Sequence, residues 1–143
     1  MSRFQIVIDT NVFLSALRSN QGASFLLVSL VGQSDLFDIN LSVPLILEYE
    51  DVAKRPDLVP NLSDQEINDI LDYLCFIAHR HAIFFLWRPF LKDPKDDMVL
   101  ELAVEAQCDY IITFNQKDFV GSQQFGINTL TPQEFLRKVG LIS

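Results

Sequence analysis

The sequence contains little cysteine, glycine and proline. Its 143 residues include two cysteines, five glycines and six prolines. Cys75 and Cys108 lie in apolar stretches and neither belongs to a CxxC motif, which excludes a disulfide framework and argues against structural zinc. The low content of glycine and proline also excludes a linker-rich or fibrous chain.

The sequence also lacks long apolar runs and an excess of basic residues. No apolar run approaches the roughly 20 residues that a membrane-spanning helix needs, and no apolar signal segment precedes Asp9. We therefore expect a soluble, cytoplasmic protein that does not contact a membrane. The net charge is -8, from 11 basic and 19 acidic residues, whereas a broad nucleic-acid-binding surface is generally basic. An acidic site can still bind phosphate if its carboxylates hold divalent metal ions.

The composition is that of a globular domain in which strands alternate with helices. Hydrophobic residues make up 49% and charged residues 21%, which excludes disorder. The length favours one domain that spans residues 1–143. Short apolar runs predict strands at residues 4–8, 36–41, 82–86, 110–113 and 127–130. Helical segments separate these runs, so we predict an α/β fold with a mostly parallel sheet of about five strands.

Local sequence signals predict where several helices begin. Ser42 is a predicted N-cap with a proline in the following turn. Ser63 and Thr131 each begin a capping-box pattern, with a glutamate three residues later. Further helices are predicted at residues 12–17 and 22–31 and after the polar loop at residues 87–95.

Acidic and amide side chains lie at or near the predicted strand ends. They are Asp9 and Asn11 after the first strand, Glu48 on the helix after the second, Asp96 and Asp97 at the start of the helix before the fourth, and Asn115 and Asp118 after the fourth. Because parallel sheets bind ligands outside the carboxyl ends of their strands, we expect these side chains to approach one another at one edge.

A cluster of carboxylates requires a positive counter-charge. Two unit charges about 4 Å apart repel by roughly 4 kcal/mol at an effective dielectric constant near 20. All of the candidate ligands are hard oxygen donors, which favours Mg²⁺ or Mn²⁺ over zinc. The chemistry that such a site performs is metal-assisted hydrolysis of a phosphodiester bond.

Each of these residues also has a structural interpretation. Asp and Asn after a strand frequently form turns or cap helices. Asp96 and Asp97 at a helix start would be favoured by the helix dipole, by about 0.3–1 kcal/mol, without any further role. Glu48 could belong to a solvated helix face.

Several segments resemble the motifs of the PIN domain family and occur in the order of that family. They are residues 6–17 (IVIDTNVFLSAL), 42–52 (SVPLILEYEDV), 93–103 (DPKDDMVLELA), 110–119 (YIITFNQKDF) and 127–135 (INTLTPQEF). The resemblance covers nearly the whole chain. Within the family, the sequence is most similar to the toxin components of bacterial toxin–antitoxin systems, which are related to the VapC toxins.

The resemblance implies a single three-layer α/β/α nuclease domain. It implies an endoribonuclease that depends on one or two Mg²⁺ or Mn²⁺ ions, binds RNA as substrate, forms a homodimer and is held inactive by an antitoxin protein. The catalytic and metal-ligating residues that it implies are Asp9, Glu48, Asp96 and Asp118. The supporting positions, which would orient carboxylates or an attacking water, are Asn11, Ser15, Thr113 and Asn115, with Asp97 as the competing choice to Asp96.

The fourth motif departs from the common pattern of the family. Asn115 stands where many members have Asp, and an amide is a weaker, neutral ligand, so Asp118 is the acidic candidate there. Because of this departure, a catalytically degenerate PIN-like module that binds RNA or a protein partner is an alternative interpretation of the sequence. A phosphatase with Asp9 as nucleophile is the other alternative, but Asn11 stands where such enzymes need a second Asp.

Overall fold

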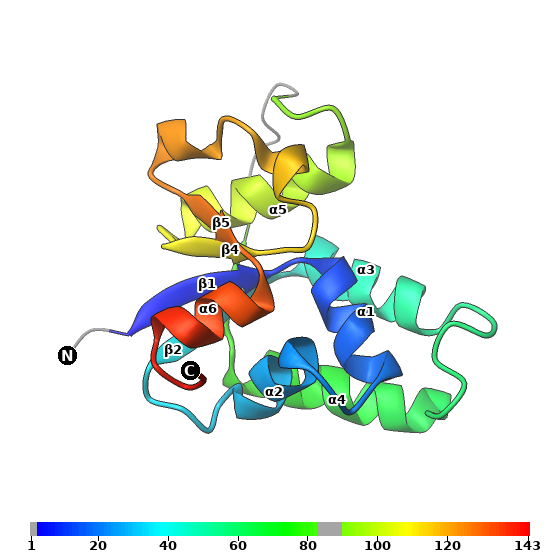
Figure 1. Ribbon diagram of the computed structural model, residues 1–143. Coiled ribbons are helices and arrows are strands. Elements are labelled where there is room, and N and C mark those ends of the chain that lie inside the picture. The colour runs from blue at the N-terminus through cyan, green and yellow to red at the C-terminus, as the bar shows by residue number, and fades with distance from the viewer. Residues whose placement is uncertain (1–2, 83–89) are drawn as a thin grey trace.

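A parallel sheet of five strands forms the centre of the molecule (Figure 1). The computed structural model describes residues 3–82 and 90–143. Within these residues the strands are Phe4–Ile8 (β1), Phe37–Ser42 (β2), His79–His81 (β3), Tyr110–Ile112 (β4) and Asn128–Leu130 (β5). Their order is β3-β2-β1-β4-β5, and every neighbouring pair is parallel. The carboxyl ends of β1 and β4 therefore lie side by side at the centre of one edge.

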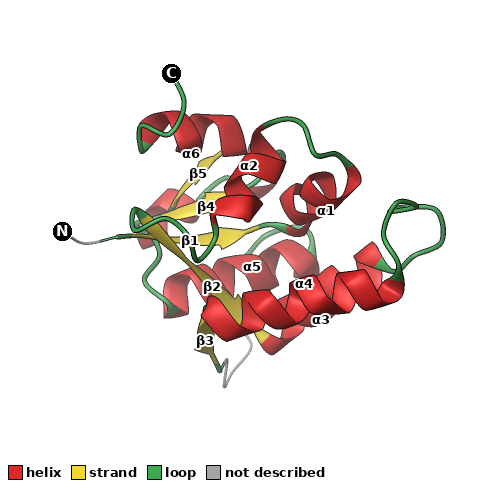
Figure 2. Ribbon diagram, turned by 90° about the horizontal axis from the view of Figure 1, so that it is seen from below, coloured by secondary structure: helices red, strands yellow, loops and turns green. Residues whose placement is uncertain are grey.

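Helices cover both faces of the sheet and make a three-layer α/β/α fold. They are Thr10–Arg18 (α1), Ala23–Leu30 (α2), Val43–Ala53 (α3), Asp64–Ile77 (α4), Pro94–Glu105 (α5) and Pro132–Lys138 (α6), with short 3₁₀ helices at Gln116–Phe119 (η1) and Ser122–Phe125 (η2). Helix α5 packs on β1, β2 and β4, whereas α6 and its neighbour α2 lie on the opposite face (Figure 1). Helix α4 runs alongside α3 (Figure 2). The predicted fold class is confirmed.

The predicted helix starts are present with their predicted caps. Ser42 accepts a hydrogen bond from the backbone N–H of Leu45, and Ser63 and Thr131 both form complete capping boxes. Each cap satisfies N–H groups that the first helical turn would otherwise leave unpaired. These helices therefore begin where local chemistry dictates.

Strand β3 lies just before the apolar run for which a strand was predicted. The apolar run at 82–86 predicted the strand, but β3 ends at His81; Ala82 is not in a strand, and residues 83–86 lie outside the described residues. The pairing with β2 is polar, because His79 Nε2 lies 3.1 Å from Asp38 Oδ2 and His81 Nε2 lies 2.9 Å from Asn40 Oδ1. A search for apolar periodicity in the sequence does not detect cross-strand polar contacts of this kind.

The described helices include none that is both long and apolar enough to cross a membrane.

Candidate active site

Asp9 is fixed at the junction of β1 and β4. It is only 8% exposed and is the N-cap of α1. Its Oδ1 accepts a hydrogen bond of 2.9 Å from the Thr10 backbone N–H, and its Oδ2 accepts one of 2.8 Å from the Thr113 hydroxyl. Its own backbone N–H donates to the Ile112 carbonyl at 2.9 Å. The carboxylate is therefore held rigidly at the carboxyl edge of the sheet.

The surroundings of Asp9 disfavour its negative charge. Burial raises the pKa of Asp9, and the hydrogen bonds from Thr113 and Thr10 oppose that rise. The nearby charges of Glu48 and Asp118 raise the pKa further. Asp9 thus shares its environment with acidic groups that are 39 and 109 positions away in the sequence.

Glu48 reaches the same edge from α3. Its Oε2 accepts a hydrogen bond of 2.6 Å from the Thr10 hydroxyl, and its Oε1 lies 3.6 Å from Lys95 Nζ on α5. Thr10 therefore joins the two carboxylates, because its N–H binds Asp9 and its hydroxyl binds Glu48. Neither Thr10 nor Lys95 was among the site residues predicted from the sequence, although each is adjacent to a predicted carboxylate.

Tyr49 is a buried residue that supports the position of Glu48. It stacks on Phe13, with ring centroids 4.3 Å apart, and its hydroxyl donates to the Ile8 carbonyl. Burial raises the pKa of Tyr49 well above its ordinary value, and the charges of Asp9 and Glu48 add to the rise. Tyr49 stays a neutral hydrogen-bond donor that anchors α3, and hence Glu48, to the end of β1.

Asp96 lies in the combined negative field of the site. Burial and neighbouring charges raise the pKa of Asp96 to about 7. The carboxylates that contribute, in decreasing order of effect, are Asp9, Asp93, Asp118 and Glu48. The charges of Asp9, Glu48 and Asp118 therefore all act on Asp96, although the four residues come from four separate segments of the chain.

Asp97 has a different task from Asp96. Its side chain is buried, and its Oδ1 accepts hydrogen bonds from the backbone N–H groups of Leu91, at 2.8 Å, and Phe90, at 3.3 Å. These bonds hold the segment that leads into α5. Because Asp97 Oδ1 already accepts these two hydrogen bonds, Asp96 is the better placed of the two candidates for a metal ligand.

The fourth motif places its amide and its carboxylate on the surface. Asn115 and Asp118 are both exposed at η1, which follows β4. The Asn115 backbone N–H donates to the Thr113 hydroxyl at 3.0 Å, and the Asp118 N–H donates to the Asn115 carbonyl at 2.9 Å. Thr113 thus links the η1 turn to Asp9, and Asp118 is free to turn toward the other carboxylates.

Two supporting positions lie on α1. Asn11 Oδ1 accepts a long hydrogen bond of 3.5 Å from the Phe114 backbone N–H and so joins α1 to the end of β4. Ser15 lies one turn further along α1 and lines a neighbouring cavity. The structure therefore does not group Ser15 with the carboxylates.

The site opens into a cavity of about 610 Å³ between α5 and η1. Asp96 and Asp118 line it together with Lys92 and Lys117. Among residues 3–82 and 90–143, no group of three or more His, Cys, Asp or Glu side chains is close enough to hold one metal ion in this conformation. The donor chemistry nevertheless suits Mg²⁺ or Mn²⁺, because the available groups are carboxylate oxygens with unbalanced negative charge.

The raised pKa of Asp96 has a measurable consequence. Without metal, we expect fold stability to decrease as the pH rises from about 4 to about 7, because the folded protein retains a proton on Asp96 that the unfolded chain, with a pKa near 3.8, has lost. The contribution of Asp96 to the free energy of unfolding is complete below the pKa of the unfolded chain, and it is lost as the pH rises to the pKa of the folded protein. Urea unfolding in EDTA, at several pH values across this range, should show a smaller decrease for Asp96→Asn than for the native protein. Identical pH profiles for the two proteins would refute this assignment.

Comparisons with known proteins agree with this architecture. No curated protein matches the sequence. The sequence profile of the PIN domain matches residues 5–117, a segment that holds Asp9, Glu48, Asp96 and Asn115 and ends one residue before Asp118. This match spans most of the chain. The protein belongs to the PIN domain family, whose domains are generally nucleases.

Proposed function

We propose that the protein is an endoribonuclease that hydrolyses RNA phosphodiester bonds with Mg²⁺ or Mn²⁺. The observation that carries this proposal is the position of Asp96, which lies in the combined field of Asp9, Asp118 and Glu48. Carboxylates concentrated at a sheet edge repel one another unless a cation neutralises them. Lys95 forms an ion pair with Glu48, and the Lys95 side chain is mostly exposed.

The candidate ligands of the ion are Asp9, Glu48, Asp96 and Asp118. A bound divalent ion would supply the positive charge that lets a phosphate approach these carboxylates and that stabilises charge on its oxygens during hydrolysis. Asp9 is already oriented by Thr10 and Thr113, so little side-chain entropy remains to be lost there. Asp118 is exposed and must turn inward to join the others.

Basic side chains near the opening support binding of an RNA backbone. Lys92 and Lys117 line the same cavity as Asp96 and Asp118. Exposed lysines attract phosphates without reading sequence. They place positive charge at this opening, although the net charge of the chain is -8.

We also propose that the protein is the toxin of a toxin–antitoxin pair and acts as a homodimer. The motif pattern described above supports this assignment. Exposed apolar side chains on α3 and α4, namely Val43, Leu47 and Phe76, offer surface for an antitoxin or a second copy of the chain. Light scattering of the purified protein would measure the oligomeric state.

Cleavage of RNA by the purified protein tests the proposed function. We expect discrete products from mixed cellular RNA in Mn²⁺ or Mg²⁺ and none in EDTA. If protein shown to be folded cleaves RNA in none of the three conditions, the proposal that the isolated chain is a ribonuclease is contradicted.

A module that binds RNA without cutting it is the second candidate. The Lys95–Glu48 ion pair and the absence of a three-ligand group in the described residues favour it, as does the amide at Asn115. A titration that detects no Mg²⁺ or Mn²⁺ binding would support this candidate over the nuclease.

A further inference from the structure

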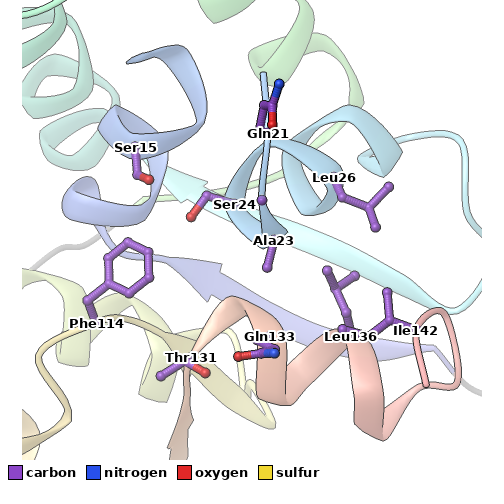
Figure 3. Close-up of a pocket in the computed structure, with 11 residues that line it drawn as sticks. Ser15, Gln21, Ala23, Ser24, Leu26, Phe114, Thr131, Gln133, Leu136 and Ile142 are labelled. Atoms are coloured by element: carbon purple, nitrogen blue, oxygen red, sulfur yellow. The ribbon is translucent and has the colours of Figure 1, made fainter. Parts of the chain in front are cut away.

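A second cavity, of about 750 Å³, adjoins the carboxylate edge (Figure 3). It is bounded by α1, by the start of α2, by α6 and by the residues that follow β4 and β5. Phe114, half-exposed, forms part of its wall directly after Thr113, the residue whose hydroxyl holds Asp9. The cavity is therefore one residue away from the candidate active site.

The two ends of this cavity differ in chemistry. At one end the hydroxyls of Ser15 and Ser24 lie near the Phe114 ring, and the Gln133 amide lies between this end and the other (Figure 3). The other end is apolar and consists of Leu26, Leu136 and Ile142. No lysine or arginine occurs among the described residues that line the cavity. A flat, uncharged ligand with a polar edge fits this surface, whereas a phosphate finds no counter-charge there.

Ser24 presents its hydroxyl to the cavity. The residue as a whole is only 5% exposed, and no hydrogen bond joins its hydroxyl to another described residue. Figure 3 shows its hydroxyl directed into the cavity, toward the end where Phe114 lies. Among the described residues no buried side-chain polar atom lacks a partner, so the unpaired Ser24 hydroxyl is open to the cavity and can bond to water or to a ligand there.

The start of α2 adds further donors beside Ser24. Gly22 is the N-cap of α2 and provides no side-chain hydrogen bond, so the first N–H groups of the helix are not capped by a side chain. Gly22 and Ala23 both line the cavity. The backbone and Ser24 together offer donors that would pair with a carbonyl oxygen of a ligand.

From these observations we propose that the cavity binds one unpaired nucleobase of the RNA, next to the phosphate that is cut. This inference rests on the proposed nuclease function. The base stacks on Phe114, since aromatic side chains are common platforms for splayed bases. Its carbonyl oxygen accepts hydrogen bonds from Ser24 and from the start of α2. Uracil and guanine carry such a carbonyl and adenine does not, so the cavity selects against adenine.

Binding of uncharged nucleosides tests the cavity separately from cleavage. Uridine and adenosine are titrated into ¹⁵N-labelled protein in EDTA, so that neither metal nor phosphate repulsion enters. We expect uridine to shift the amide signals of Ala23, Ser24 and Phe114, and adenosine to bind at least about fivefold more weakly. Shifts that are absent, that lie elsewhere, or that are equal for the two nucleosides overturn the proposal.

Two variants and two matched controls sharpen the test. Phe114→Ala should weaken uridine binding at least about fivefold, through lost stacking. Ser24→Ala should remove the preference for uridine over adenosine, and it should leave the fold intact because the hydroxyl has no partner in the described structure. Phe125→Ala, at an aromatic residue 41% exposed on η2 and outside the lining of this cavity, and Ser29→Ala, on the exposed face of α2, should leave both affinities unchanged.

Cleavage of RNA separates failure of the cavity from failure of the nuclease. If the protein cleaves RNA and adenine is accepted equally at every position flanking the cut, the nuclease function stands and the cavity proposal falls. If uridine binds as described but no RNA is cut, the cavity binds bases and the carboxylate edge is not a nuclease site.

Discussion

Replacing Asp9 by Asn should lower RNA cleavage by about a thousandfold, equivalent to about 4 kcal/mol of transition-state stabilisation. Asp9 is the most constrained of the four carboxylates, with one oxygen bound to the Thr10 N–H and the other to the Thr113 hydroxyl. An amide at this position keeps the shape of the side chain and removes the charge that a divalent ion requires. Initial rates in Mn²⁺, for the native protein and the variant, measure the effect.

The Asp9→Asn variant should remain folded. Asn is as good an N-cap as Asp, so the start of α1 is retained. Loss of a buried charge also relieves the unfavourable environment that raises the pKa of Asp9. Asp109→Asn is the matched control, because Asp109 likewise accepts a backbone N–H, from Gln5 at 2.8 Å, but lies at the start of β4, at the opposite edge of the sheet. A folded Asp9→Asn protein that cleaves at the native rate would remove Asp9 from the mechanism.

Saturating Mn²⁺ should stabilise the fold by about 2.7 kcal/mol at 100 times the dissociation constant, if only the folded state binds the ion. For a domain of this size the melting temperature should rise by roughly 10 °C. The physical reason is that an ion offsets the repulsion that Asp96 experiences from Asp9 and Glu48. Thermal unfolding over a concentration series of Mn²⁺ and Mg²⁺, with EDTA as reference, provides the measurement.

Variants of the candidate ligands should remove this stabilisation. Glu48→Gln and Asp96→Asn should each reduce the rise in melting temperature, whereas Asp109→Asn should keep all of it. An equal rise in all four proteins would mean that the ions bind elsewhere. No rise in the native protein at any concentration would favour the module that binds RNA without cutting.

Local signals were sufficient to predict much of the fold. Ser42, Ser63 and Thr131 cap their helices with hydrogen bonds that span only three residues, so the sequence itself contains the whole interaction. The alternation of apolar runs with helices likewise predicted the α/β class. Strand β3, at His79–His81, was not predicted, because polar contacts of His79 and His81 with β2, about 40 residues away, accompany its pairing.

The candidate site was predictable as a set of residue types but not as a geometry. Asp96 and Asp97 are adjacent in the first turn of α5, and the family resemblance favoured Asp96 with Asp97 as the competing choice. The distinction comes from the Leu91 and Phe90 N–H groups, which engage Asp97. The Lys95–Glu48 ion pair joins α5 to α3 and was equally hidden, because it depends on how these helices pack.

The cavity beside Phe114 illustrates the same limit. Its walls come from segments near residues 15, 24, 114 and 133, and no spacing among these four segments predicts that they enclose one cavity. Ser24 is informative only because the fold packs most of the residue away from solvent and leaves its hydroxyl facing the cavity, with no bond to another described residue. Such a signal requires side-chain packing and cannot be read from residue spacing.

Crystals of the protein grown with Mn²⁺ test the proposed metal site most directly. Anomalous scattering identifies the ion, and we expect a peak at the carboxyl edge of the sheet that contacts Asp9 and Asp96, with Glu48 released from Lys95 and Asp118 turned inward. A peak that is absent at saturating Mn²⁺, or that lies away from Asp9, would contradict a metal-dependent nuclease centre at this edge.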